Sequence, residues 1–156
     1  MKVFFAMLVT FSTISAVAAD MSSTEAKGLQ AKIKIENVRV RLPAPGMKNT
    51  GMFMEISNTD AVEHTIVKAT GTDSNIVELH DHIKTDGVMK MREIKEIRLK
   101  PGSKTVLKPG SLHVMLIDLK KELKEGEDIE VGLVFSNNET INVKGPVQKI
   151  QIPMKK

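Results

Sequence analysis

Residues 128–143 have the sequence DIEVGLVFSNNETINV, in which two apolar runs flank a turn. The first run carries apolar side chains at every second position: Ile129, Val131, Leu133 and Phe135. Side chains two residues apart share one face of a β-strand, so this run has one apolar face. Asn137-Asn138 is a turn signal, and the alternation resumes at Ile141 and Val143. The stretch predicts a β-hairpin that buries one of its faces.

The same period of two is present upstream, from Ile33 onwards. Ile33 and Ile35 alternate with polar residues, and Val38 and Val40 then alternate in the opposite parity. One extra residue in a strand reverses which face its side chains occupy. We therefore expect a β-bulge near Glu36-Asn37.

Turn dipeptides separate the other apolar runs at short intervals: Asp86-Gly87, Pro101-Gly102, Pro109-Gly110 and Glu125-Gly126. Only Lys120–Lys124 has the pattern of a helical turn. About eight or nine short strands without a long helix predict an all-β fold, either a Greek-key sandwich or a small barrel. No repeat, low-complexity stretch or linker divides the chain. We expect one β domain over residues 32–156.

The N-terminal residues are expected to be removed from the mature protein. A basic start at Lys2 precedes a mostly apolar stretch from Val3 to Val17 and the small residues Ala18-Ala19. This order is typical of a secretory signal peptide, which we place at residues 1–19. The stretch is too short and too interrupted to predict a membrane span, so no membrane insertion is expected after cleavage. Residues 20–31 predict a flexible lead-in, and the mature chain is expected in a bacterial periplasm.

The composition excludes several classes of function. The 156 residues include no Cys, Trp or Tyr, but they include ten Met. Without Cys the chain has no disulfide, thiolate metal site, iron–sulfur cluster or thiol nucleophile, and no lipid anchor is expected at the cleavage site. A net charge of +4 and few aromatic rings argue against nucleic-acid binding. A soft-metal site here has to use thioether or imidazole donors.

Three of the four histidines lie close to methionines in the sequence. They form pairs two residues apart, each pair on one strand face: His80 and His82, Met89 and Met91, His113 and Met115. The Asp86-Gly87 turn makes the first two pairs a hairpin. A four-residue loop sets His80 opposite Met91, whereas a two-residue loop sets His82 opposite Met91, and both registers remain open. Either register puts imidazole and thioether groups on one face.

Imidazole and thioether together indicate a soft-metal site. Thioether sulfur is a neutral, soft donor that suits Cu(I) and has little affinity for Zn²⁺, Mg²⁺ or Ca²⁺. Glu78 and Asp81 are candidates to orient an imidazole ring beside such a site. The remaining candidates are assigned to structure: Met52 and Met54 to the core, and His64 to a structural or surface role.

The spacing His80-x10-Met91-x21-His113-x-Met115 resembles the motif of periplasmic copper chaperones of the PCu(A)C family. Other segments are also similar to the family: Val77–His80, Asp86–Arg92, Leu107–Gly110, Leu123–Glu127 and Leu133–Phe135. The similarity extends over residues 33–146. The resemblance implies a cupredoxin-like β fold that binds one Cu(I) ion. The ligands that it implies are His80, Met91, His113 and Met115.

The resemblance also implies a role and a partner. Members of the family help to load copper into the CuA centre of cytochrome c oxidase, alongside thiol-bearing assembly factors. The implied partner is therefore a copper-acceptor protein, and no catalytic activity is expected. Many relatives have a C-terminal tail rich in Met and His, whereas this chain ends QIPMKK, so a second, Cu(II)-binding site is not expected. His82 and Met89 are additional donors that could assist the site.

Two other interpretations compete with a copper chaperone. His80, His82 and His113 could form a three-His zinc site with an open water position in a hydrolase-like protein, but the methionines would then be unexplained. A metal-free β-sandwich binding module would use the methionines only as apolar filler. A blue-copper electron carrier is excluded because it requires a Cys ligand.

Overall fold

The computed structural model describes residues 28–85 and 87–151. The signal peptide predicted at residues 1–19 lies outside these residues, as does the predicted lead-in up to residue 27. Residues 28–32 form one helical turn, in which Leu29 is buried against the core. The last part of the predicted lead-in is therefore packed onto the domain.

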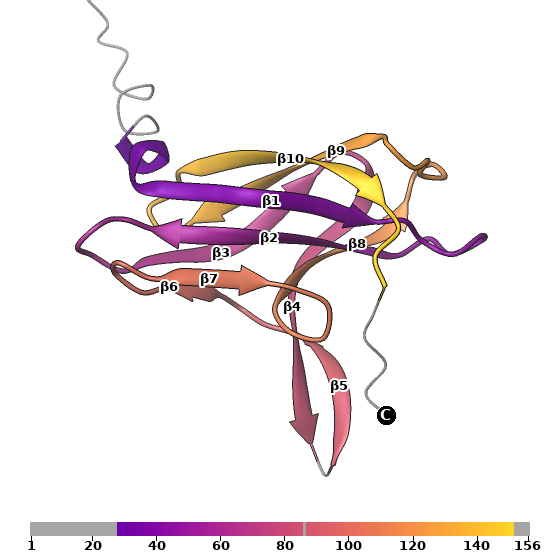
Figure 1. Cartoon of the computed structure of the whole chain (residues 1–156), viewed down its shortest axis with the longest axis horizontal. Coiled ribbons are helices and arrows are strands. Elements are labelled where there is room, and N and C mark those ends of the chain that lie inside the picture. The colour runs from indigo at the N-terminus through magenta and orange to yellow at the C-terminus, as the bar shows by residue number, and fades with distance from the viewer. Residues whose placement is uncertain (1–27, 86, 152–156) are drawn as a thin grey trace, which may run out of the picture.

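Ten strands follow the helical turn (Figure 1): β1 (Ile33–Arg41), β2 (Thr50–Asn58), β3 (His64–Gly71), β4 (Ser74–Thr85), β5 (Val88–Glu93), β6 (Ile97–Leu99), β7 (Lys104–Leu107), β8 (His113–Leu119), β9 (Asp128–Phe135) and β10 (Thr140–Gln148). The all-β prediction is confirmed, with ten strands in place of the eight or nine expected. The short helical pattern at Lys120–Lys124 does not form a helical turn, because these residues form a bend and an irregular loop. Leu123 of this loop is buried in the core, which accounts for its apolar spacing.

The strands pair in the order β5-β4-β8-β2-β1-β10-β9-β3-β6, and β7 also pairs with β2. β1 and β10 run parallel, with Val40 beside Val147, and join two antiparallel halves of the sheet. The bulge expected near Glu36-Asn37 is confirmed. The pairing of β1 with β2 shifts between Glu36 and Arg39, and Asn37 has a φ of 53°.

One apolar core contains buried side chains from both halves of the sheet. The apolar face predicted for residues 128–143 lies in it, with the four inward side chains of β9 at most 1% exposed. Met52 and Met54 of β2 are 0% and 1% exposed, which confirms their assignment to the core. Burying a side chain of this size stabilises the fold by about 1.5–3 kcal/mol.

His64, at the start of β3, has the structural role that was expected for it. Its Nε2 lies 2.9 Å from Asp60 Oδ2, and the Lys32 ammonium contacts the same carboxylate oxygen at 2.9 Å. These two partners lower the pKa of Asp60 to about 2. The contacts connect the end of the helical turn to the turn before β3.

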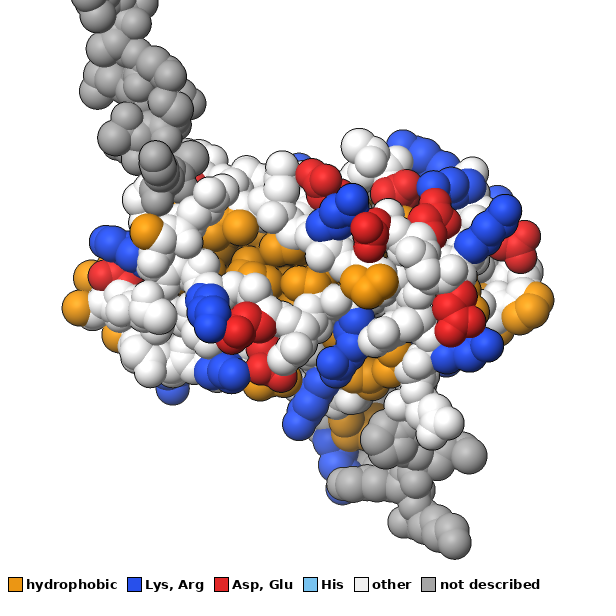
Figure 2. Space-filling view, turned by 45° about the horizontal axis from the view of Figure 1, so that its top comes forward, with side chains coloured by type: hydrophobic (Ala, Val, Ile, Leu, Met, Phe, Trp, Pro, Cys, Tyr) orange, Lys and Arg blue, Asp and Glu red, His pale blue; other side chains and the backbone are white. Residues whose placement is uncertain are grey.

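The β4–β5 hairpin projects from the body of the molecule (Figure 1). β5 ends the strand order, and all six of its residues are exposed. Over the surface seen in Figure 2, acidic and basic side chains are interspersed, in keeping with the small net charge. In the described part of the chain, no helix is long and apolar enough to cross a membrane.

Candidate metal centre

The β4–β5 pairing settles which hairpin register is formed. Thr85 pairs with Val88, so only residues 86–87 form the loop. His82 lies opposite Met91, as the two-residue loop requires. His80 lies opposite Glu93, and Met91 is its diagonal neighbour on the same face. The register that pairs His80 with Met91 is therefore wrong, although the two side chains share a face.

The pairing of β4 with β8 brings the second His-Met pair onto that face. His80 lies opposite His113, and Glu78 lies opposite Met115. The ring centroids of His80 and His113 are 5.7 Å apart, and those of His82 and His113 are 5.2 Å apart. The neighbouring residues Leu79 and Val114 point to the other face and are buried in the core. The donors thus lie on the outer face of the sheet, with the core directly behind them.

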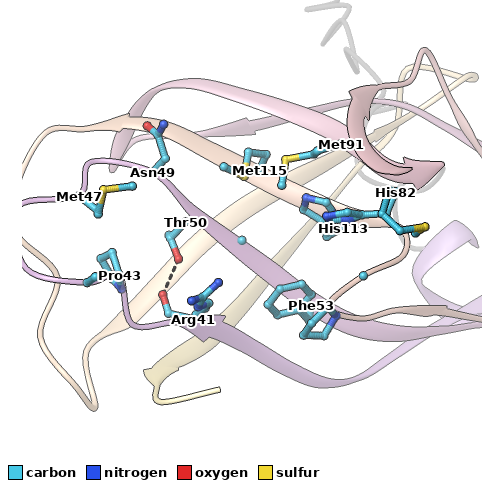
Figure 3. A pocket seen from close by; sticks show the side chains of 15 residues that line it. Arg41, Pro43, Met47, Asn49, Thr50, Phe53, His82, Met91, His113 and Met115 are labelled. Carbon is cyan, nitrogen blue, oxygen red and sulfur yellow. Dashed lines mark hydrogen bonds between the residues drawn. The ribbon is translucent and has the colours of Figure 1, made fainter. Parts of the chain in front are cut away.

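A cavity of about 470 Å³ lies over this face. His82, Met91, His113 and Met115 line it (Figure 3). Residues of the loop between β1 and β2 form another part of its wall. There the Thr50 hydroxyl donates a hydrogen bond to the Arg41 carbonyl, which connects the two ends of that loop.

His113 is the most enclosed of the donors, at 2% exposed. Its Nδ1 donates a hydrogen bond to the Ser111 carbonyl at 2.8 Å, which leaves Nε2 with the lone pair. Burial lowers the pKa of His113, and the nearby His82 and His80 lower it further. A neutral imidazole is the form that binds a metal ion.

His80 has one ring nitrogen occupied and one without a partner. Its Nε2 donates to Glu78 Oε2 at 2.7 Å, in the carboxylate–imidazole arrangement that often orients a metal-binding histidine. Its Nδ1 is buried and has no hydrogen-bond partner in the structure. A buried nitrogen without a partner is costly, and a metal ion would remove that cost. Of the two acidic residues predicted to orient an imidazole, Glu78 contacts the His80 ring, whereas Asp81 accepts a hydrogen bond from the His82 backbone N–H.

The two methionines differ in their access to solvent. Met91 on β5 is 47% exposed, whereas Met115 on β8 is half-buried. The face therefore combines enclosed imidazole nitrogen with accessible thioether sulfur. That donor set fits a soft monovalent ion such as Cu(I), and it adds no negative charge to the site.

The three-His zinc site gains no support from the geometry. Among the described residues, no three His, Asp or Glu side chains are placed to hold one metal ion together. His82 lines the cavity. Its Nδ1 lies 3.5 Å from the Ser111 carbonyl, the same carbonyl that accepts a hydrogen bond from His113.

Two residues that carry no metal-binding group, Phe53 and Gly51, line the cavity beside His113. Phe53 is 4% exposed but lies outside the main apolar core, with its ring centroid 6.0 Å from that of His113. Gly51 lies opposite Met115. A Cβ at Gly51 would lie 3.0 Å from Phe53 Cζ and 3.6 Å from His113 Cδ2, so glycine leaves room for both rings. Only the pairing of β2 with β8 reveals this contact.

Comparison with families and curated proteins identifies relatives of the chain. The family model described as "Putative lipoprotein LpqE-like" matches residues 33–147. A protein of Leifsonia xyli subsp. xyli, named as a lipoprotein, is 33% identical over 129 residues, which cover 81% of this chain and 76% of the relative. An uncharacterized protein of Rickettsia prowazekii is 31% identical over 101 residues, which cover 63% of this chain and 56% of that protein.

Solved structures of PCuAC domains have the same fold. The copper-bound PCuAC domain from PmoF2 matches with a TM-score of 0.64 and 25% identity, over 76% of this chain and 94% of that domain. The apo PCuAC domain from PmoF1 matches with a TM-score of 0.65 and 26% identity, over 76% of this chain and 95% of that domain. The solution structure of CuI-DR1885 from Deinococcus radiodurans matches with a TM-score of 0.59 and 25% identity, over 81% of this chain and 86% of that protein. The predicted resemblance and the cupredoxin-like β-sandwich are therefore confirmed.

Proposed function

The chain belongs to the LpqE-like lipoprotein family and has the fold of PCuAC domains, and on this basis we propose that it is a periplasmic Cu(I) chaperone. It binds one Cu(I) ion through His80, Met91, His113 and Met115. It then passes the ion to an acceptor protein. The role needs no general acid, base or nucleophile, so we propose no enzymatic activity.

The observation that carries the proposal is the buried, unpartnered Nδ1 of His80 on a strand directly opposite His113. Glu78 and the Ser111 carbonyl hold the other nitrogens of the two rings. Each imidazole thereby keeps one nitrogen lone pair free, on the sheet face that also carries Met91 and Met115. Neither a zinc enzyme nor a metal-free module requires methionine at these positions.

The exposure of the donors suits a protein that must also release its ion. The enclosed imidazole of His113 shields the ion from water, while Met91 stands at the accessible edge. Thioethers are neutral ligands that a thiolate or imidazole can displace. We propose a copper acceptor of that kind, either the CuA subunit of cytochrome c oxidase or a thiol-bearing assembly factor. Export through the signal peptide at residues 1–19 would place the chain in the same compartment.

A Cu(I) competition titration of the purified mature chain tests the function. Under anaerobic, reducing conditions we expect one tightly bound Cu(I) ion per chain. X-ray absorption should then count both sulfur and nitrogen neighbours at the ion. The same titration with Zn²⁺ is the comparison, because a strong preference for Zn²⁺ would favour the three-His site. Absence of tight binding of either ion would favour the metal-free binding module.

A further inference from the structure

The methionines of the described residues fall into two groups. Met52 and Met54 are buried in the core, at 0% and 1% exposed. The other methionines all line the cavity over the donor face: Met47, Met89, Met91 and Met115. Only Met91 and Met115 belong to the proposed Cu(I) site. Met47 and Met89 therefore need a separate explanation.

Apolar character alone does not explain why Met47 and Met89 are there. The large apolar side chains that are exposed include three methionines, Met47, Met89 and Met91, and all of them line this cavity. The others are aliphatic and do not line it: Val62, Val67, Ile76, Val88 and Val106. Among the large exposed apolar side chains of the described chain, the cavity wall thus has only the sulfur-bearing ones.

Met47 and Met89 lie at the outer margin of the cavity. Met89 is two residues beyond Met91 on the same face of β5, opposite Lys84, and is 53% exposed. Met47 is in the loop between β1 and β2 and is 58% exposed. Figure 3 shows it toward the end of the cavity away from His82 and His113. The exposed fraction of the donor side chains thus rises from 2% at His113 and 47% at Met91 to 53% at Met89 and 58% at Met47.

We propose an outer transfer site made of two separate donors, Met47 and Met89, each of which accepts Cu(I) from the inner ligands on its way to or from a partner. The proposal rests on the proposed Cu(I) function. In each step one copper–thioether bond forms at Met89 or Met47 while one copper bond to an inner ligand breaks. Every incoming ligand is a neutral sulfur, so the ion remains Cu(I) and neither a proton nor an electron moves.

Stepwise exchange explains how a half-enclosed ion can leave quickly. Without outer donors, the ion must lose its protein ligands before the acceptor reaches it. With a thioether next to Met91, the ion keeps soft ligands as it moves outward to the surface. The outer methionines then determine the rate of transfer, whereas the inner four ligands determine the equilibrium affinity.

The test is a transfer-rate measurement on the double variant Met47→Leu/Met89→Leu. Wild type and variant are each loaded with one equivalent of Cu(I) under anaerobic conditions. They are then mixed with excess bathocuproine disulfonate, and copper transfer is followed by absorbance in a stopped-flow instrument. We expect transfer to slow by about tenfold or more while the equilibrium Cu(I) affinity changes less than about twofold. The matched control Val88→Leu alters an exposed apolar residue of the same hairpin outside the cavity, and should transfer at the wild-type rate.

The outcomes separate this inference from the proposed function. An unchanged transfer rate in the double variant overturns the transfer site and leaves the inner site intact. A large loss of equilibrium affinity also overturns it, because Met47 and Met89 would then be resting ligands. Failure of the wild type to bind Cu(I) overturns the proposed function itself.

Discussion

His80 and His113 lie directly opposite each other on β4 and β8, with 5.7 Å between their ring centroids and 62° between their ring planes. Each ring has one nitrogen held by an acceptor, Glu78 for His80 and the Ser111 carbonyl for His113. Such an acceptor fixes the proton on that nitrogen and leaves the lone pair on the other one. Groups outside the donor set thus orient both imidazoles before an ion arrives.

Replacing the two thioethers should separate copper binding from folding. Met91→Leu and Met115→Leu nearly conserve volume on the outer face, so each should lower the free energy of unfolding by less than about 1.5 kcal/mol. The double variant should lose at least about tenfold in Cu(I) affinity. Replacing a residue that only hydrogen-bonds to a metal ligand already lowers metal affinity by that factor. Urea unfolding and Cu(I) competition titration measure the two effects.

The control for these variants is Met54→Leu, which changes a core methionine away from the cavity. It should cost a similar amount of stability and leave Cu(I) affinity unchanged. An unchanged affinity in the Met91→Leu/Met115→Leu protein would support the metal-free interpretation.

Glu78 should be a positioning residue that acts on copper through His80. Glu78→Gln keeps an oxygen acceptor near His80 Nε2 but removes the negative charge that stabilises the N–H donor. We expect Cu(I) affinity to fall about tenfold, with one ion still bound per chain. Glu93→Gln is the matched control, because Glu93 lies opposite His80 on β5 but is exposed. Equal losses in both variants would point to a general effect of charge and not to the Glu78–His80 contact.

The fold could be predicted largely from the sequence, because local alternation reports which side chains are buried. The β9–β10 hairpin and the bulge at Glu36-Asn37 follow directly from that pattern. The helical pattern at Lys120–Lys124 does not correspond to a helix, because tertiary packing buries Leu123 in the core from an irregular loop.

The donor face was predicted in part. Parity placed His80 on one face of the hairpin with Met91, and His113 on one face of its strand with Met115. The pairing of β4 with β5 and β8 shows that all four residues share a face. Their assignment as copper ligands remains a prediction. The hairpin register stayed open because Asp86-Gly87 is compatible with loops of two lengths.

Other features of the site could not be predicted because they depend on strands that are distant in sequence. Phe53 and Gly51 reach His113 only because β2 pairs with β8. Met47 reaches the cavity only because the loop after β1 lies over the same face. Local periodicity contains no information about such contacts.

The stability of the apo protein should fall as the solution becomes mildly acidic. Burial lowers the pKa of His113 below its ordinary value of 6.5, so the unfolded chain binds this proton more readily than the native chain. Stability from this group is therefore complete above pH 6.5, and it decreases as the pH falls from 6.5 toward the lowered pKa. Urea unfolding of the apo protein at a series of pH values measures the slope.

His113→Gln removes the titrating group and keeps a side chain that can donate to the Ser111 carbonyl. The free energy of unfolding should change less steeply with pH across this range in the variant than in the wild type. A wild-type protein whose stability rises as the pH falls through the same range would contradict the prediction.

Gly51→Ala should disturb the cavity wall beside His113 without touching a donor atom. The new Cβ would lie 3.0 Å from Phe53 Cζ, closer than ordinary van der Waals contact, and 3.6 Å from His113 Cδ2. The Phe53 ring has to move, and because it packs against the His113 ring, that imidazole should shift with it. We expect a loss of about 1–3 kcal/mol in the free energy of unfolding, as for other overpacked sites.

Gly71→Ala is the matched control for this substitution. It is also a strand glycine, but its Cβ would meet its nearest neighbours at 3.4 Å, an ordinary contact distance. Its stability should stay within about 1 kcal/mol of wild type. NMR chemical shifts of the His113 ring should change in Gly51→Ala and remain constant in Gly71→Ala. If the ring signals stay constant in both variants while Gly51→Ala loses stability, Phe53 moves independently of His113 and does not position it.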